Sequence, residues 1–122
     1  MNRLVKVYKA MGDETRFNIL MLLASRNICA KGISKHLDIT EAAVSQHIKI
    51  LKEAELITGY KKGYHIMYEL NKDILTEAQE LIQLLIIQDI SQIQSNYSSA
   101  DVKVCKLDCK WVKGCCNKEK GE

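Results

Sequence analysis

The stretch from Thr40 to Tyr68, TEAAVSQHIKILKEAELITGYKKGYHIMY, decides the fold of this chain. Thr40 is a suitable N-cap for a helix over 41–54, because its side-chain oxygen can accept a hydrogen bond from a free backbone amide of the first turn. Within that helix Val44, Ile48 and Leu51 follow a 4, 3 spacing and are expected to pack inward. The outward face is short, polar and ends in lysines: Glu41, Ala42, Ser45, Gln46, Lys49 and Lys52.

After this helix the sequence period changes to that of strands. Segments 56–60 and 64–68 are rich in β-branched and aromatic residues, and they flank Lys61-Lys62-Gly63. The pattern predicts a β-hairpin with a basic loop at its tip. Two adjacent lysines at such a tip can lie along a phosphate backbone.

Three further helices are expected upstream. Apolar residues at helical spacing predict a short helix over 3–11 that is ended by Gly12. Asp13 is a suitable N-cap for a second helix that runs to about Ala24. A third short helix is expected at about 30–37. Two helices joined by a tight turn and followed by a basic hairpin have the order of a winged helix-turn-helix.

A long helix is expected from about Asn71 to Ser95, and its apolar residues lie on two faces. One series consists of Ile74, Ala78, Leu81 and Leu85, and the other of Ile82, Ile86, Ile90 and Ile93. A surface helix of a monomer needs only one apolar stripe, so the second stripe predicts a partner. A symmetric homodimer is the simplest source of that partner.

Length and composition predict one domain with a tail. With 122 residues we expect a winged helix-turn-helix and dimerisation domain over 1–95 and a cysteine-rich tail over 96–122, disordered at its end. Residues 1–70 carry 11 basic against 7 acidic side chains, a net charge of +4, which favours a phosphate-binding head. The sequence has neither a membrane span nor a signal peptide pattern, so we expect a cytoplasmic protein.

Two segments give the chain a family resemblance that extends over roughly residues 3 to 95. Residues 9–20, KAMGDETRFNIL, resemble the opening of the arsenic- and metal-sensing (ArsR/SmtB) repressors, and residues 43–57, AVSQHIKILKEAELI, are similar to their recognition helix and wing entry. The resemblance implies a mainly α fold with a β-hairpin wing (α+β), a winged helix-turn-helix of order ααααββα.

The resemblance also implies a homodimeric repressor that binds a palindromic double-stranded DNA operator through two recognition helices. The residues expected to contact bases are Glu41, Ala42, Ser45 and Gln46, with His47 and Lys49 nearer the backbone and Lys61 and Lys62 on the wing. The dimer interface is expected at Leu4, Val5, Tyr8, Leu81, Leu85 and Ile86. Glu41 departs from the family's usual Gln-Ser or Gln-Pro start: it either accepts from a cytosine or is a solvated charge.

Two effector sites known in the family have no counterpart here. The family's Cys-Val-Cys-Asp-Leu-Cys stretch is matched only by Cys29, with Lys31 and Ser34 at the other ligand positions. We therefore expect Cys29 to be a small buried hydrophobic residue. A second family site needs histidines on the last helix, and residues 71–95 contain none. His36 and His65, on a helix and a strand, are expected to be surface residues.

The remaining effector candidates are four tail thiols, Cys105, Cys109, Cys115 and Cys116. Three thiolates suit As(III) or Sb(III), and four suit cadmium or zinc, because soft ions prefer sulfur. Neighbouring lysines favour the thiolate form, and some arsenic sensors of the family also carry vicinal thiolates near the C-terminus. A redox or reactive-sulfur switch, a structural zinc tail and an iron-sulfur cluster are the alternatives.

Two other functional classes are compatible with the residues. A thiol oxidoreductase or metal reductase would use the vicinal cysteines, but no Cys-x-x-Cys lies beside a strand-helix unit, so we expect no enzyme. A protein-interaction module would keep the fold without binding DNA. Loss of operator binding on replacing Ser45, Gln46 and Lys49 separates the repressor from this module.

Overall fold

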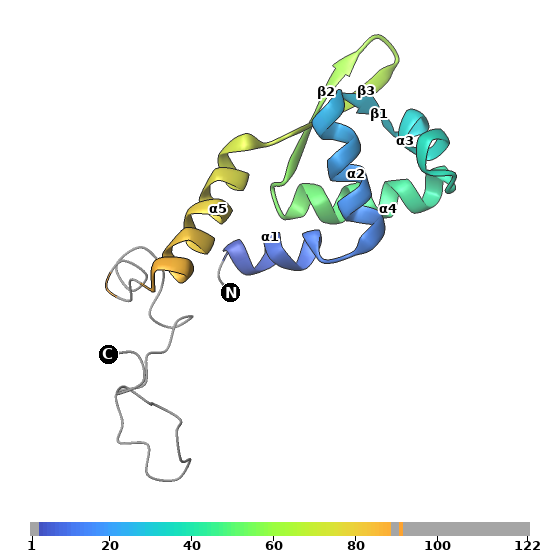
Figure 1. Cartoon of the computed structure of the whole chain (residues 1–122). Coiled ribbons are helices and arrows are strands. Elements are labelled where there is room, and N and C mark those ends of the chain that lie inside the picture. The colour runs from blue at the N-terminus through green and yellow to red at the C-terminus, as the bar shows by residue number, and fades with distance from the viewer. Residues whose placement is uncertain (1–2, 89–90, 92–122) are drawn as a thin grey trace.

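The computed structural model describes residues 3–88 and residue 91. In chain order the elements are α1 (Arg3–Met11), α2 (Glu14–Ser25), β1 (Ile28–Cys29), α3 (Ala30–Leu37), α4 (Glu41–Glu53), β2 (Ile57–Lys62), β3 (His65–Leu70) and α5 (Lys72–Ile87) (Figure 1). The predicted fold class is confirmed: helices pack against a small antiparallel sheet whose β2–β3 hairpin projects as a wing. The strand β1 was not predicted.

Side-chain caps begin the helices that the sequence assigned to them. Asp13 Oδ2 accepts a hydrogen bond of 3.0 Å from the backbone nitrogen of Arg16, at the start of α2. Thr40 Oγ1 accepts one of 3.1 Å from Ala43, at the start of α4. Each cap satisfies an amide that has no partner within its helix, and both were predicted.

The sheet has the order β1-β3-β2, and all neighbours are antiparallel. The strand β1 adds one short edge by pairing Ile28 with Tyr68 and Cys29 with Met67. Two residues are too few to show a strand period in sequence, which is why β1 was missed. Cys29 is half-buried rather than buried, a correction to its expected role.

The wing turn is tighter than predicted. Lys61 and Lys62 are the last residues of β2, paired with Ile66 and His65, and they are not in the loop. The loop consists of Gly63 and Tyr64, and among these only Gly63 has a positive φ, of 64°. A positive φ at the first loop residue alone is typical of a type II′ turn, whose twist matches that of the strands.

One hydrophobic core unites the elements. Its residues come from every helix and from β1 and β2: Leu4, Val7, Ala10, Ile19, Leu20, Leu23, Ile28, Ile33, Val44, Ile48, Leu51, Ala54, Leu56, Ile57, Ile74 and Ala78. The inward face predicted for α4 is confirmed, since Val44, Ile48 and Leu51 are all buried. Burial of this face fixes the rotation of α4 and therefore decides which of its side chains meet solvent.

The helix α5 ends earlier than expected. It stops at Ile87, where Gln88 adopts a left-handed conformation with φ 59° and its backbone N–H bonds to the carbonyls of Leu84 and Leu85. The rest of the predicted helix lies outside the described residues, apart from Ser91, which is helical. Within residues 3–88, no helix is both long and apolar enough to cross a membrane.

The helices α1 and α5 lie side by side within one chain (Figure 1). The Tyr8 hydroxyl donates to the Ala78 carbonyl, and Arg3 pairs with Glu77. Leu4 is buried in the chain's own core, and Leu81 and Tyr8 are half-buried against it. The assignment of these three residues to a dimer interface stays a prediction. Val5, Leu85 and Ile86 remain exposed.

Candidate nucleic-acid interface

The outward face of α4 is solvent-exposed as predicted. Glu41, Ala42, Ser45, Gln46 and Lys49 are all exposed, while the intervening core residues are not. The stripe therefore presents a carboxylate, a hydroxyl, an amide and an ammonium group along one side of a helix that fits the major groove.

The turn between α3 and α4 sets the angle at which α4 is presented. Asp38 ends α3 in a left-handed conformation with φ 57°, and its N–H bonds to the Ser34 carbonyl. The Ser34 hydroxyl in turn donates to the Ile39 carbonyl over 2.5 Å. Aspartate tolerates this conformation better than most residues, so a turn of three residues suffices to connect the two helices.

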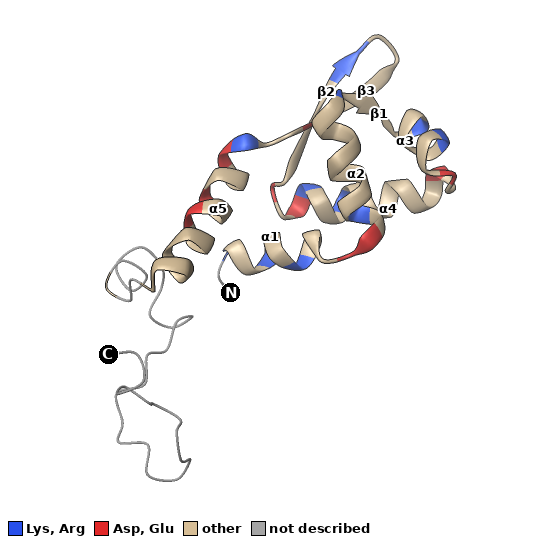
Figure 2. Ribbon diagram, in the orientation of Figure 1, with Lys and Arg blue, Asp and Glu red and all other residues tan. Residues whose placement is uncertain are grey.

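Positive charge lies on the wing and on α3 and α4 (Figure 2). Lys61 and Lys62 are exposed on β2 close to the wing tip, and Lys49 and Lys52 are exposed along α4. A hollow of about 350 Å³ lies beside α4 and is lined by Ala30, Ser45, Ile48, Lys49, Lys52, Glu53 and Tyr68. Lysines around a hollow beside α4 suit contacts with phosphates that flank a groove.

His47 differs from its neighbours on α4 because its ring turns towards the start of α2. Its Nδ1 atom lies 3.5 Å from a terminal nitrogen of Arg16 and 4.0 Å from Asp13 Oδ2. The prediction placed His47 near the DNA backbone, and no local sequence signal linked it to Asp13 or Arg16. Residues 31 and 34 positions apart meet here only because α2 packs against α4.

The pKa of the Asp13 carboxyl is lowered by its neighbours Arg16 and His47. The hydrogen bond from the Arg16 backbone amide holds the pKa of the Asp13 carboxyl below its ordinary value of 3.8. The charge of Arg16, and that of His47 when its ring is protonated, act in the same direction. Partial desolvation opposes them but does not prevail. The carboxylate is therefore ionised at neutral pH, the state in which it caps α2 best.

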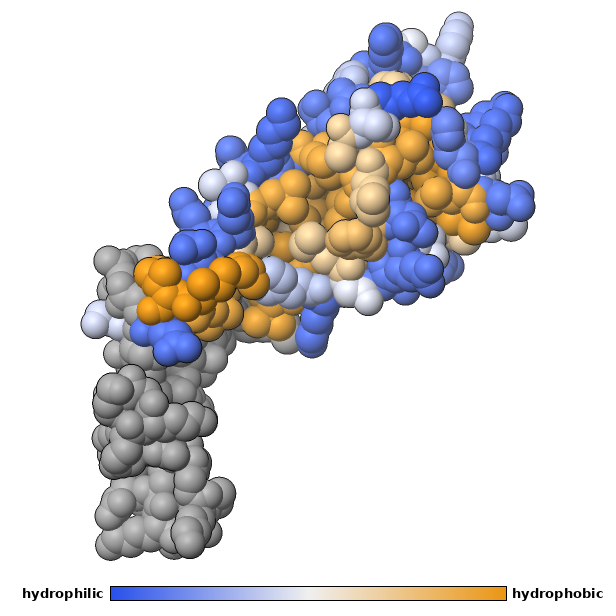
Figure 3. All heavy atoms as spheres, viewed as in Figure 1, coloured by the Kyte–Doolittle hydropathy of each residue, from blue (hydrophilic) through white to orange (hydrophobic). Residues whose placement is uncertain are grey.

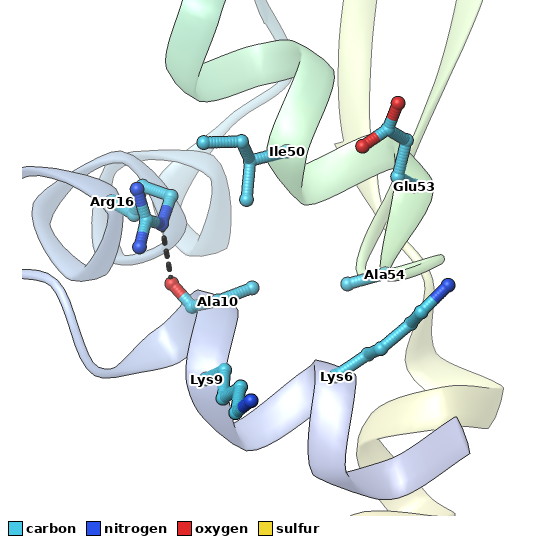
Figure 4. Close-up of a pocket in the computed structure, with 7 residues that line it drawn as sticks. All are labelled: Lys6, Lys9, Ala10, Arg16, Ile50, Glu53 and Ala54. Atoms are coloured by element: carbon cyan, nitrogen blue, oxygen red, sulfur yellow. Dashed lines mark hydrogen bonds between the residues drawn. The ribbon is translucent and has the colours of Figure 1, made fainter. Parts of the chain in front are cut away.

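A second cavity, of about 210 Å³, lies where α1, α2 and α4 meet (Figure 4). Its lining residues are Lys6, Lys9, Ala10, Arg16, Ile50, Glu53 and Ala54. Across it, Arg16 Nε donates a hydrogen bond of 2.8 Å to the Ala10 carbonyl. Arg16 thus joins the end of α1 to the start of α2 and reaches α4 as well.

Metal-ligating residues do not gather in the described part of the chain. Residues 3–88 and 91 contain no group of three or more histidine, cysteine, aspartate or glutamate side chains placed to hold an ion. His36 and His65 are exposed, as expected. The predicted thiol ligands Cys105, Cys109, Cys115 and Cys116 lie outside the described residues.

Comparison with known proteins gives the same fold and a family. Residues 13–58, from the α2 cap to the start of the wing, match the family described as "Bacterial regulatory protein, arsR family". The transcriptional repressor SdpR of Bacillus subtilis is 40% identical over 72 residues, which are 59% of this chain and 80% of that protein. The chain belongs to the ArsR family.

Other relatives extend the match beyond the helix-turn-helix. An arsenical resistance operon repressor of Staphylococcus xylosus is 29% identical over 78% of this chain and 91% of its own length. The structure of HlyU from Vibrio cholerae aligns with a TM-score of 0.57 at 30% identity, covering 68% of this chain and 87% of that one. An ArsR-like regulator from Rhodococcus gives a TM-score of 0.67 at 20% identity, over 84% and 95% of the two chains, which supports the fold.

Membership in the ArsR family makes the chain a DNA-binding transcriptional regulator and not an enzyme, as predicted. The residues that contact DNA remain predictions made from the exposed faces of α4 and the wing.

Proposed function

We propose that the chain is a homodimeric transcriptional repressor that binds a palindromic operator through α4 and the wing. The observation that carries this proposal is the exposed polar stripe of α4, together with the exposed lysines of β2. In a dimer the two α4 helices would enter successive major grooves, with centres about 34–36 Å apart. Ser45 and Gln46 would contact base edges, and Lys49, Lys61 and Lys62 would contact phosphates.

The test is binding to a duplex that the wild-type protein enriches from a random-sequence library. Replacing Ser45, Gln46 and Lys49 together by alanine should abolish specific binding, whereas Lys72→Ala, an exposed lysine on α5, should leave it unchanged. The logarithm of affinity falls linearly with the logarithm of salt concentration. Replacing Lys61 by alanine should make this fall shallower by about 0.9 for every phosphate that the variant no longer neutralises. A wild-type protein with no affinity for DNA at low salt contradicts the proposal.

The dimer is proposed to form through the exposed apolar side of α5. Ile82, Leu85, Ile86 and Ile87 are between 44% and 67% exposed, and Figure 3 shows the hydrophobic surface that α5 presents. A monomer would leave these side chains in water at a cost of about 25 cal/mol for each Å² of apolar surface. Val5 of the neighbouring α1, 38% exposed, would contribute to the same interface.

The proposed effector is a soft metal or metalloid ion, As(III), Sb(III) or Cd, bound by the tail thiolates Cys105, Cys109, Cys115 and Cys116. Two observations support it: the soft donor set itself, and relatives named arsenical resistance operon repressors. Binding would relieve repression if the ion favours a dimer geometry that no longer fits adjacent grooves, a coupling of about 1–3 kcal/mol.

Mobility-shift titrations with arsenite, cadmium and zinc would test the effector, with a variant in which all four tail cysteines are serine as control. Release of DNA by an ion in the wild type alone supports the proposal. An equal response of the variant, or no response to any ion, contradicts it. Release by the oxidant diamide, reversed by dithiothreitol, would favour the alternative of a thiol redox or reactive-sulfur sensor.

A structural zinc tail is the other alternative to an effector site. Protein purified without oxygen would then contain zinc at stoichiometric level, and the metal would remain bound in the DNA complex. Measuring metal content and free thiols of the same preparation separates this alternative from ion sensing.

A further inference from the structure

The environment of His47 fixes which of its ring nitrogens carries the proton. Nδ1 lies 3.5 Å from a guanidinium nitrogen of Arg16, and guanidinium groups only donate hydrogen bonds. The contact therefore requires Nδ1 to accept. The alternative partner, Asp13 Oδ2, is 4.0 Å away, beyond hydrogen-bonding distance. In this arrangement the ring is neutral and its proton is on Nε2.

The protonated edge of the ring reaches the surface. Among the described residues no buried side-chain nitrogen or oxygen lacks a hydrogen-bond partner. Since the polar contacts of the His47 ring with Arg16 and Asp13 both involve Nδ1, Nε2 is not buried, and the side chain is 24% exposed. His47 follows Gln46 directly on α4, one helical step from the exposed stripe. Its Nε2–H is thus open to solvent on α4, and in the proposed complex it would meet a phosphate of the DNA backbone.

Arg16 is held in place independently of His47. Its Nε donates to the Ala10 carbonyl over 2.8 Å, which anchors the guanidinium to the end of α1 (Figure 4). Its backbone amide donates to Asp13 at the start of α2. A planar guanidinium anchored at one nitrogen can present another in a fixed direction, a property that lysine lacks.

We propose that Arg16 is a positioning residue for DNA binding, which acts by holding His47 as the tautomer that donates through Nε2–H to a DNA phosphate. The inference rests on the proposed function, because it needs α4 in the major groove. It assigns a role to a residue of α2 that is not among the predicted contact residues. In many proteins, the hydrogen bond made by one ring nitrogen of a histidine determines the tautomer and orients the other nitrogen.

Nitrogen-15 NMR of the imidazole groups tests the first step. At alkaline pH, the wild-type spectrum should show the Nε2–H tautomer for this ring, and Arg16→Gln should shift it towards a mixture. Arg26→Gln, at an exposed arginine that follows α2, is the matched control and should leave the spectrum unchanged. A wild-type ring protonated at Nδ1 overturns the proposal.

A double-mutant cycle on the enriched duplex tests the second step. Replacing His47 by alanine should weaken binding about tenfold, as expected for loss of one hydrogen bond to a charged group. The salt slope should stay unchanged, because a neutral donor releases no counterion. Arg16→Gln should weaken binding comparably in the wild type but by less than about twofold when His47 is already alanine.

If Arg16 has only a structural role, Arg16→Gln should reduce DNA affinity equally with His47 present and with His47 replaced by alanine. That result overturns the proposal. Circular dichroism at the assay temperature verifies that each variant is folded, so that the affinities compare native proteins. Failure of the proposed function is distinguishable, because the wild-type protein would then bind no duplex. If the wild type binds and the cycle shows no coupling, only the role of Arg16 is wrong.

Discussion

The hydroxyl of Tyr8 donates a hydrogen bond of 2.5 Å to the backbone carbonyl of Ala78, tying α1 to α5 within the chain. The bond links the two helices that carry the exposed apolar residues of the proposed dimer interface. Packing between α1 and α5 within the chain therefore shapes the surface that a second copy would meet.

Replacing Tyr8 by phenylalanine should lower the free energy of unfolding by about 1 kcal/mol, because the ring stays packed while one part-buried hydrogen bond is lost. Urea titration at fixed protein concentration measures the change. Tyr64→Phe is the matched control, since Tyr64 is fully exposed at the wing turn and should change stability little. Equal effects of the two substitutions would show that the Tyr8 bond contributes nothing.

Introducing a charge into the apolar side of α5 should dissociate the dimer. Ile86 is 67% exposed, so glutamate at this position is readily solvated in a monomer but would be desolvated in the proposed interface. Sedimentation velocity should show the wild type as a dimer and Ile86→Glu as a folded monomer. Met21→Glu, at a 60% exposed position on α2, should remain dimeric. A dimeric Ile86→Glu protein would place the interface elsewhere.

The Asp13 carboxylate should make stability depend on pH in the acid range. Because its pKa is lower in the folded protein than the ordinary 3.8, the stabilisation is present above that value and is lost as pH falls through the folded pKa. Asp13→Asn keeps a capping oxygen but removes the charge, so its free energy of unfolding should fall less steeply below about pH 4. Glu80→Gln on α5 serves as control. Parallel profiles for wild type and Asp13→Asn would exclude this contribution.

The sequence was sufficient for features that depend on local patterns. The caps at Asp13 and Thr40, the inward face of α4 and the exposed stripe all follow from spacing and side-chain chemistry, and the structure confirms them. Each of these features depends on residues that lie within a few positions of one another in the sequence. The family resemblance added the winged order of the elements, which periodicity alone left open.

Features that depend on packing between distant segments could not be predicted in this way. Leu4 has the same apolar character as Val5, yet one is buried in the core and the other is 38% exposed. The difference depends on how α1 packs against α2, α4 and α5. The short strand β1 forms because Ile28 pairs with Tyr68 of β3, which is distant in the sequence. The contact of His47 with Arg16 likewise arises from helix packing, which leaves no trace in local spacing.

Gly63 at the wing turn should tolerate a side chain poorly, for conformational rather than steric reasons. Its φ is 64°, while a Cβ built there meets no atom within 4 Å. Gly63→Ala should therefore lower the free energy of unfolding by about 1 kcal/mol through backbone strain alone. Gly12→Ala is the matched control: a Cβ there would make only ordinary contacts, at 3.4 Å or more, and urea titration should show little change. Equal stability of the two alanine variants would contradict the predicted backbone strain at position 63.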